Sequence, residues 1–249
     1  MVVGVLHPGE MGAAIGAALR GCGHTVLWAS SGRSPATADR ARLAGLEDLR
    51  TAEGLARRSE VILSVCPPHA AAEVAKSTAE FNGIYVDANA IAPATSRSVG
   101  AEMARYVDGG IIGPPPHSAG TTRLYLSGTE APDVASLFAG TTVDARVLSV
   151  RIGDASALKM VYAAWTKGTA ALLLAIGNVA RATGVDDALQ NEWALSLPGL
   201  PDAARRAASS ASAKGWRWVG EMEEIASTFA AASQPAGFHS AAADVFRGT

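Results

Sequence analysis

Short apolar runs alternate with amphipathic stretches over the first part of the chain. Runs of strand length, each bounded by polar or turn-forming residues, occupy positions 2–6, 25–29, 61–65, 84–88 and 146–151. Between them, apolar residues recur with helical spacing at positions 11–20, 37–44, 70–78 and 93–104. Strands that alternate with helices in this way predict a mostly parallel sheet.

The pattern changes after Asp154, where only helical spacing remains. It opens with a run that extends to about Thr183, which is unusually long for a helix of a globular protein. We therefore divide the chain into an α/β domain, residues 1–150, and a smaller all-α domain, residues 151–249, which a long interdomain helix opens. We expect an active site in the cleft between the two domains.

A glycine-containing turn lies where the first strand meets the first helix. Gly9 would let the backbone approach a pyrophosphate, and Gly12 would let the helix pack close to the sheet. His7 stands where the first glycine of the G-x-G-x-x-G fingerprint is usual. In this context the turn predicts a Rossmann domain that binds a dinucleotide through His7, Pro8, Gly9, Glu10, Met11 and Gly12.

The end of the second strand indicates which dinucleotide is bound. An NAD site usually places an acidic residue there, about 20 residues beyond the fingerprint, to accept a hydrogen bond from the ribose 2′-hydroxyl. No acid is present, and the segment offers hydroxyl groups and a guanidinium that suit a 2′-phosphate, those of Ser30, Ser31, Arg33 and Ser34. The sequence thus predicts NADP(H), with Cys66 and Pro67, after the third strand, as further cofactor contacts.

Composition and charge exclude several other classes. The 249 residues include 21 Lys and Arg against 23 Asp and Glu, so no strongly basic surface is available to bind nucleic acid. The longest uninterrupted apolar run, residues 170–176, is far below the ~18 residues of a membrane span, and the N-terminus lacks the features of a signal peptide. We expect a cytoplasmic protein with two reduced cysteines and no metal site.

Lysine is scarce, with four residues in the chain, and two of them fall on the predicted long helix. A lysine near the start of an apolar helix must find a partner, lie at a cleft or lose its proton. On helical spacing Lys159, Tyr162, Thr166 and Lys167 share one face, so that two ammonium groups would depress one another's pKa. That face predicts an acid–base site.

Three segments, residues 7–12, 86–93 and 153–159, resemble the β-hydroxyacid dehydrogenase superfamily, which includes 6-phosphogluconate and 3-hydroxyisobutyrate dehydrogenases. The resemblance extends to about residue 180, and the segment 216–226 is similar to a short C-terminal domain of unknown function in one branch of that superfamily. It implies that Lys159 is the general acid/base and that the loop 87–93, with Asn89 and Ala90, lines the substrate pocket. It also implies a homodimer.

The chain departs from the family pattern at substrate positions. Asn89 and Ala163 replace a serine and an asparagine, and Gly113, Pro114 and Pro115 replace a Ser-Gly-Gly turn whose N–H groups bind a substrate carboxylate in the family. Proline has no N–H to donate, so these residues do not support capture of a substrate carboxylate by this turn, and the resemblance does not identify the substrate as a hydroxy acid. The predicted substrate contacts are Asn89, Ala90, Gly113, Pro114, Pro115, Thr166, Lys167 and His239.

These observations predict an oxidoreductase that transfers a hydride between NADP(H) and a small carbonyl or hydroxy compound, with Lys159 and Tyr162 as the catalytic residues. An imine reductase, a reductase of a deazaflavin carrier and a nucleotide-binding module without catalysis remain as alternatives. The second domain, of about one hundred residues, is too small to bury both its own core and the apolar surface of its long first helix. We therefore expect a homodimer with residues 154–183 in the interface.

Overall fold

The computed structural model describes residues 1–248 and divides the chain into two compact units. The first unit is Met1–Lys159, and the second begins at Met160. The division falls inside helix α7 (Asp154–Ala182), later than the predicted boundary at residue 151. The physical reason is that the first turns of α7 pack against a strand of the sheet, as described below.

The first unit is built on an eight-stranded sheet with the order β3-β2-β1-β4-β5-β6-β7-β8 within the described residues. Neighbouring strands are parallel, except for the antiparallel pair β6 and β7. The strands are β1 (Val2–Leu6), β2 (Thr25–Trp28), β3 (Glu47–Asp48), β4 (Val61–Ser64), β5 (Ile84–Asp87), β6 (Tyr106–Ile112), β7 (Thr122–Ser127) and β8 (Val143–Ser149). The predicted mostly parallel sheet is therefore confirmed.

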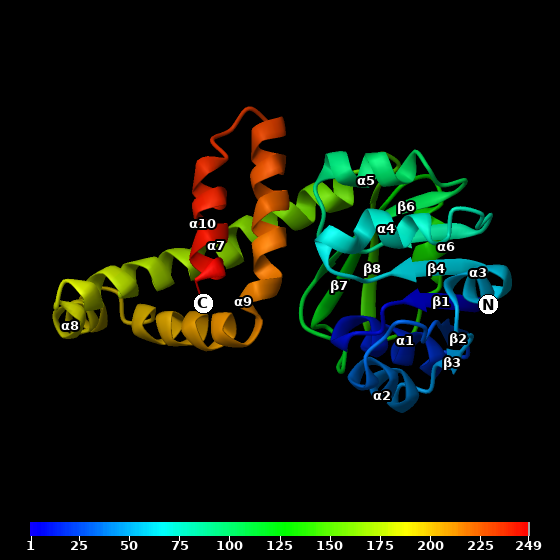
Figure 1. Ribbon diagram of the computed structural model, residues 1–249, viewed down its shortest axis with the longest axis horizontal. Coiled ribbons are helices and arrows are strands. Elements are labelled where there is room, and N and C mark those ends of the chain that lie inside the picture. Colours follow the sequence, from blue (N-terminus) through cyan, green and yellow to red (C-terminus); the bar gives the residue numbers. More distant parts are fainter. Residues whose placement is uncertain (249) are drawn as a thin grey trace. The chain divides into compact units, whose positions relative to one another are not determined.

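Helices cover both faces of the sheet (Figure 1). Val3 and Val5 of β1 point to a core that includes side chains of α1 (Glu10–Gly21), α2 (Pro35–Leu43) and α6 (Ala131–Ser136). Leu6 points to the opposite core, which α3 (Ala52–Arg58), α4 (Ala71–Lys76) and α5 (Pro93–Gly100) close. Because side chains alternate along a strand, both faces of β1 are buried.

The strand order reverses beside β1, since the chain passes from β1 outward to β2 and β3 and then returns to β4 on the other side. In open parallel sheets, ligands bind at such a switch point, outside the carboxyl ends of the strands. The turn after β1 and the loops after β2 and β4 all lie at that edge. The topology thus brings the predicted cofactor residues to one place.

The second unit is helical and comprises the remainder of α7, α8 (Asp186–Ser196), α9 (Leu200–Ala231) and α10 (Gly237–Arg247). Leu173 of α7, Trp193 of α8 and Ala207 of α9 form one small core. The C-terminal half of α9 runs antiparallel to α10 and contacts it through Trp218 and Phe246, whose ring centroids are 5.1 Å apart. The predicted all-α second part is confirmed.

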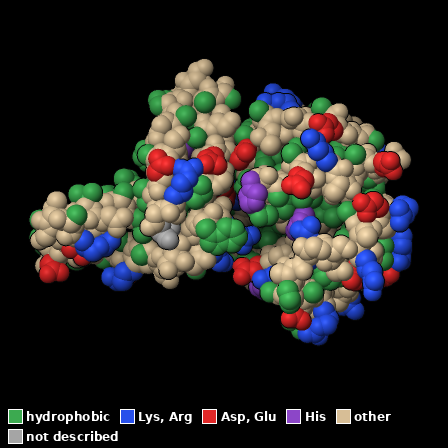
Figure 2. Space-filling model, viewed as in Figure 1, with side chains coloured by type: hydrophobic (Ala, Val, Ile, Leu, Met, Phe, Trp, Pro, Cys, Tyr) green, Lys and Arg blue, Asp and Glu red, His purple; other side chains and the backbone are tan. Residues whose placement is uncertain are grey.

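Helix α7 is the one described helix that is long and apolar enough to cross a membrane by length and composition, although its longest unbroken apolar run is short. The core helix of a soluble protein passes the same test, so this finding alone is weak evidence for a membrane. Lys159 and Lys167 interrupt the apolar sequence of this continuous helix. In the face shown in Figure 2, basic side chains are interspersed with acidic ones.

Candidate cofactor and catalytic site

The turn after β1 has the geometry that a dinucleotide phosphate requires. A β-carbon added to Gly12 would lie 2.8 Å from the carbonyl oxygen of His7, so only glycine lets α1 approach the turn this closely. Among the described residues, a β-carbon at Gly9 would meet no atom within 4 Å, and no side-chain hydrogen bond caps the start of α1. A helix N-terminus without a side-chain cap is a suitable place for a phosphate.

His7 adopts the left-handed conformation that its glycine counterpart would adopt, with a φ of 66°. Such a conformation is strained for a residue that carries a β-carbon, at a cost of about 1 kcal/mol or more. The Gly9 N–H donates to the His7 carbonyl oxygen at 2.7 Å and closes the turn. Histidine thus preserves the backbone of the fingerprint and adds an imidazole to it.

A cavity of about 230 Å³ lies beside this turn. His7, Ser31 and Arg33, which the sequence predicted as cofactor contacts, line it together. They are joined by groups that the sequence did not point to, notably Glu73 and Ser77 from α4 and the residue that follows it. Glu73 escaped prediction because only the fold brings α4 next to the loop after β2.

The loop after β2 is held by an acid that the sequence did not single out. Asp48, paired with Trp28 in the sheet, accepts hydrogen bonds through one carboxylate oxygen from the N–H groups of Ser30, at 3.2 Å, and Arg50, at 2.8 Å. Ser34 caps α2 by accepting from the Thr37 N–H. Ser34 thus stabilises the loop, and Ser31 and Arg33 are the members of the predicted set that face the cavity.

The loop after β4 is fixed by Asn89. The side-chain oxygen of Asn89 accepts from the Cys66 N–H at 2.6 Å, and its amide nitrogen donates to the Ser64 hydroxyl at 3.1 Å. Asn89 is buried, and its own N–H donates to Asp87 at 3.0 Å. Its side chain therefore joins the ends of β4 and β5, which sets the position of Cys66 and Pro67.

The thiol of Cys66 remains protonated at physiological pH. Burial, and to a smaller extent the negative charge of Asp87, together raise its pKa from 9.0 to about 12. No disulfide involves it, since Cys22 and Cys66 are both free. Cys66 thus contributes its backbone and a neutral side chain to this edge of the sheet.

Lys159 lies on α7 above the middle of β6. A β-carbon added to Gly110 would lie 2.7 Å from the Ala155 carbonyl oxygen and 3.1 Å from the β-carbon of Lys159. The absence of a side chain at Gly110 therefore lets α7 lie directly on the strand. Lys159 is half-buried at the boundary between the sheet and the rest of α7.

Asp108 of β6 anchors the start of α7. One carboxylate oxygen accepts from Ser127 at 2.8 Å and from the N–H groups of Gly153 and Ser156 at 3.0 Å each. The other accepts from the hydroxyls of Ser96, at 2.9 Å, and Ser156, at 2.5 Å. A carboxylate at a helix N-terminus is favoured by the helix dipole, so Asp108 fixes the turn that precedes Lys159.

The loop after β6 carries the prolines of the predicted substrate turn. Gly113 has a φ of 128°, and a β-carbon there would lie 2.2 Å from the Thr121 carbonyl oxygen. The Pro114 carbonyl oxygen accepts from the Thr122 hydroxyl at 2.5 Å, while the Pro115 carbonyl oxygen accepts from the His117 N–H at 2.8 Å. The turn is thus fixed by its carbonyl groups, and Pro114 and Pro115 have no N–H to offer. Ala90 lies half-buried in the loop after β5.

The other predicted substrate residues belong to the helical unit. Lys167 forms an ion pair with Glu221 of α9 at 2.9 Å, and its ammonium lies 5.9 Å from the centre of the Trp218 ring. Tyr162 and Thr166 are exposed. Lys159 and Lys167 are about 12 Å apart along the helix axis, and Lys167 has an acidic partner, so the structure does not bring the two ammonium groups together as the helical spacing suggested.

His239 packs inside the helical unit between two phenylalanine rings. Its ring centroid is 4.2 Å from that of Phe229 and 5.3 Å from that of Phe238. Burial lowers its pKa below the usual 6.5. His239 therefore belongs to the packing of α9 against α10.

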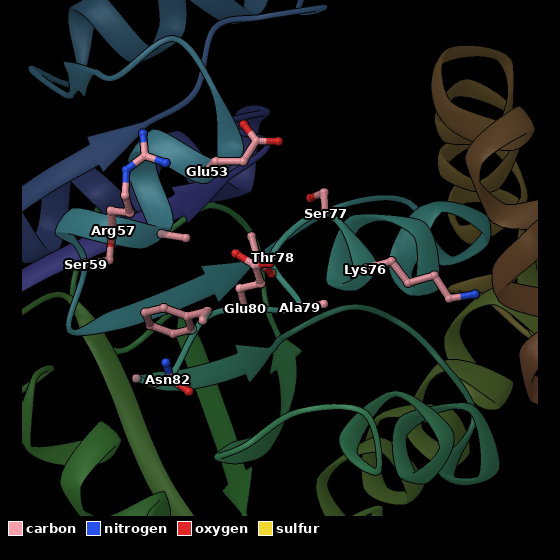
Figure 3. Close-up of a pocket in the computed structure, with 12 residues that line it drawn as sticks. Glu53, Arg57, Ser59, Lys76, Ser77, Thr78, Ala79, Glu80 and Asn82 are labelled. Atoms are coloured by element: carbon pink, nitrogen blue, oxygen red, sulfur yellow. The ribbon is translucent and has the colours of Figure 1, made fainter.

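A larger cavity, of about 660 Å³, lies elsewhere (Figure 3). It is lined by α3 and by the segment between α4 and β5, near the amino ends of β4 and β5. Figure 3 shows Glu53 and Arg57 extending from α3, while the Lys76 side chain extends away from them. Because ligands of such sheets bind at the carboxyl ends of the strands, this cavity is not the predicted site.

Two family descriptions match separate parts of the chain. Residues 2–90 match the family described as NADP oxidoreductase, coenzyme F420-dependent. Residues 180–249 match a domain of unknown function, DUF1932. A protein of Methanothermus fervidus, described as an uncharacterised 28.5 kDa protein in the 7S RNA 5′ region, is 30% identical over 161 residues. That match spans 64% of this chain and 62% of the relative.

Solved structures share the fold over almost the full length. A conserved protein of unknown function, MTH1747, described as similar to 3-hydroxyacid dehydrogenases, is 27% identical, with a TM-score of 0.73 over 100% of this chain and 96% of its own. A 3-hydroxyisobutyrate dehydrogenase from Salmonella typhimurium is 16% identical, with a TM-score of 0.76 and coverages of 100% and 93%. An imine reductase from Streptomyces aurantiacus is 20% identical, with a TM-score of 0.57 and coverages of 99% and 93%.

The resemblance that the motifs indicated is thereby confirmed. The chain resembles the β-hydroxyacid dehydrogenases, and its residues 180–249 match a domain of unknown function. The solved structures below 25% identity establish the fold alone, and the two enzymes among them act on different substrates by their names.

Proposed function

We propose that the protein is an NADP(H)-dependent oxidoreductase that reduces or oxidises a small carbonyl or hydroxy compound. The observation that carries the proposal is the meeting of three elements at one edge of the sheet. The start of α1, which no side chain of the described residues caps, follows Gly9, and the cavity next to it is lined by Ser31 and Arg33. Lys159 of α7 packs over Gly110, near the carboxyl end of β6.

The residues present fit the cofactor. The start of α1 next to Gly9 would bind the pyrophosphate, because it has no side-chain cap among the described residues and carries the positive end of the helix dipole. Ser31 and Arg33 would bind the 2′-phosphate, since a guanidinium can grip two of its oxygens. The nicotinamide ring, when bound, supplies or accepts the hydride. The name of the family matched by residues 2–90 also supports this cofactor.

Lys159 is the proposed proton donor and acceptor for the substrate oxygen. Its helix is fixed to β6 through Asp108, so the ammonium is held by rigid elements rather than by a mobile loop. Tyr162 is exposed one turn further along α7 and would be the second candidate for proton transfer. In the loop after β6, Pro114 and Pro115 cannot donate N–H groups to a carboxylate, which favours a substrate that this loop contacts by shape.

The proposed cofactor is tested by comparing NADPH and NADH in titration calorimetry. NADPH should bind at least tenfold more tightly, because charged hydrogen bonds contribute about 1.5–3 kcal/mol. Arg33→Ala should remove most of that difference. Arg42→Ala is the matched control, since Arg42 pairs with Asp39 on the exposed side of α2 and should leave the difference unchanged. Equal affinities for the two cofactors in the unaltered protein would refute the preference.

The proposed reaction is tested with a panel of small aldehydes, β-keto acids and cyclic imines. On the best substrate, Lys159→Met should lower turnover by roughly 10²–10⁴ while NADPH affinity is retained. Lys76→Met, which changes an exposed lysine of the same unit, should leave turnover unchanged. Near-normal turnover of Lys159→Met would refute the role of Lys159.

The same panel, extended by a deazaflavin, separates the alternatives. Reduction of cyclic imines in preference to aldehydes and keto acids would identify an imine reductase, whose fold is shared. Oxidation of NADPH by a deazaflavin alone would identify a carrier reductase, an alternative that the family matched by residues 2–90 also suggests. Tight NADPH binding without oxidation by any substrate would identify a nucleotide-binding module.

A further inference from the structure

The imidazole of His7 is an unexplained group at the proposed cofactor site. The φ of 66° at His7 is strained for a residue with a β-carbon, so a glycine would adopt the same backbone conformation at lower conformational cost. Nevertheless a large, titratable side chain occupies the position, and Nδ1 of its ring is buried without a hydrogen-bond partner among the described residues. A strained residue with an unsatisfied polar atom indicates that the side chain has a use.

The surroundings of His7 indicate the charge of what it binds. In the parallel register Val5 pairs with Trp28, so the residues that follow each strand, His7 among them, lie next to the Ser30–Ser34 loop. His7 and Arg33 line the same cavity. The other charged group that lines it is the exposed Glu73 of α4, and the remaining elements around the cavity contribute alanines, serines and aliphatic side chains.

The charge of Arg33 adds to the effect of burial on His7. Burial, and to a smaller extent the charge of Arg33, together lower the pKa of His7 from 6.5 to about 4. At neutral pH the ligand-free cavity therefore has one permanent cation, Arg33, and one neutral imidazole. A bound dianion would reverse the balance, because opposite charge favours the protonated form of a neighbouring histidine.

We propose that His7 binds the 2′-phosphate of NADP(H) as an imidazolium and that binding of this cofactor therefore takes up a proton. The inference rests on the proposed NADP(H) function and assigns to His7 a role that the fingerprint glycine cannot perform. Arg33 supplies the constant part of the attraction. His7 supplies a second positive charge only when the phosphate is present, so it contributes to the discrimination against NADH.

Proton uptake is measured by titration calorimetry of NADPH at pH 6.5 in buffers of different ionisation enthalpy. The unaltered protein should take up a substantial fraction of one proton per NADPH bound. NADH, which lacks the 2′-phosphate, should bind without this uptake. The fragment adenosine 2′,5′-bisphosphate should reproduce the uptake, because it carries the phosphate without the nicotinamide.

Three variants assign the proton. His7→Gln keeps a polar side chain without a titratable ring and should abolish the uptake while weakening NADPH binding by about tenfold or less, in line with one charged contact. His7→Gly should weaken NADPH to a similar degree and leave the melting temperature unchanged or higher, because glycine relieves the strained φ. His24→Gln is the matched control, because His24 precedes β2 at the opposite edge of the sheet, where its ring hydrogen-bonds to the Leu137 carbonyl oxygen. This variant should take up as much of a proton on binding NADPH as the unaltered protein.

The outcomes separate this inference from the proposed function. Persistence of the uptake in His7→Gln, or its absence in the unaltered protein, overturns the role of His7 while the NADP(H) function stands. Failure of NADPH and adenosine 2′,5′-bisphosphate to bind at all overturns the proposed function, and the role of His7 with it. Uptake that depends on both His7 and the 2′-phosphate supports the inference.

Discussion

Replacement of Asp108 tests how the start of α7, and with it Lys159, is held in place. This buried carboxylate accepts hydrogen bonds from three serine hydroxyls and from the N–H groups of Gly153 and Ser156. Asp108→Asn keeps the shape of the side chain but offers one oxygen in place of two and removes the charge. Asp108→Ala removes all acceptors.

The expected loss follows from the contacts. In Asp108→Asn the amide oxygen can keep the bonds from Ser127, Gly153 and Ser156, each weaker by about 1 kcal/mol without the charge. The hydroxyls opposite the new NH₂ group must turn to accept, and relief of a buried charge offsets part of the loss. We expect a decrease of about 2–3 kcal/mol in the free energy of unfolding. Asp108→Ala leaves two buried N–H groups without acceptors and should cost about 3–5 kcal/mol.

Urea unfolding followed by circular dichroism measures these losses, with Asp39→Asn as the control. Asp39 is exposed and pairs with Arg42 on α2, so its replacement should change the free energy of unfolding by less than about 0.5 kcal/mol. Asp108→Asn should also lower turnover more than it lowers NADPH affinity, because the cofactor contacts lie on other elements. Each buried N–H group left without an acceptor should cost about 1–3 kcal/mol. A loss below about 1 kcal/mol for Asp108→Ala would therefore refute the role of Asp108 in holding the start of α7.

Three further results are expected. Light scattering at micromolar concentration should give twice the chain mass, and a monomeric unaltered protein would refute the predicted homodimer. Trp165→Glu should give one chain mass, because Trp165, 74% exposed, lies with other exposed apolar residues on one stripe of α7. Leu195→Glu on α8 is the control and should leave the dimer intact. The ligand-free protein should lose stability as the pH falls from 6.5 towards 4, because His7 then binds a proton in the unfolded state but, with its pKa of about 4, not in the folded state. The loss should be smaller in His7→Gln, and equal losses in the two proteins would contradict the low pKa of folded His7. Lys167→Met should lower the urea midpoint because it removes the cation that pairs with the buried Glu221, and the double variant Lys167→Met/Glu221→Leu should recover most of the loss. A double variant no more stable than Lys167→Met would show that loss of this ion pair is not the cause.

The elements that the sequence predicted correctly are those whose signals are local. The turn between β1 and α1 was recognised because glycine spacing and a strand-to-helix change occur within a few residues. In contrast, β6 was missed. Asp108, Gly109 and Gly110 interrupt its apolar pattern, and each is explained only by a distant neighbour. A carboxylate in the middle of a strand gains its partners from the start of α7, and glycine at 110 is required by the approach of that helix.

The site shows the same limit. The loop after β2 was identified from its residue types, but the carboxylate that holds it comes from β3, a strand of two residues that no periodicity reveals. Glu73 reaches the same cavity from α4, and its sequence neighbours give no sign of it. Residue types thus led to the prediction of which groups bind the cofactor, which stays a prediction, whereas the groups that position them depend on contacts between elements far apart in the chain.

The two lysines of α7 illustrate what helical spacing can and cannot decide. Spacing places Lys159 and Lys167 on one side of a helix, but it does not say which element covers that side at each turn. At Lys159 the covering element is β6, which offers a glycine, and at Lys167 it is α9, which offers Glu221. The two lysines therefore have different surroundings, because each turn of the helix packs against a different element, and the spacing along the helix alone does not reveal that difference.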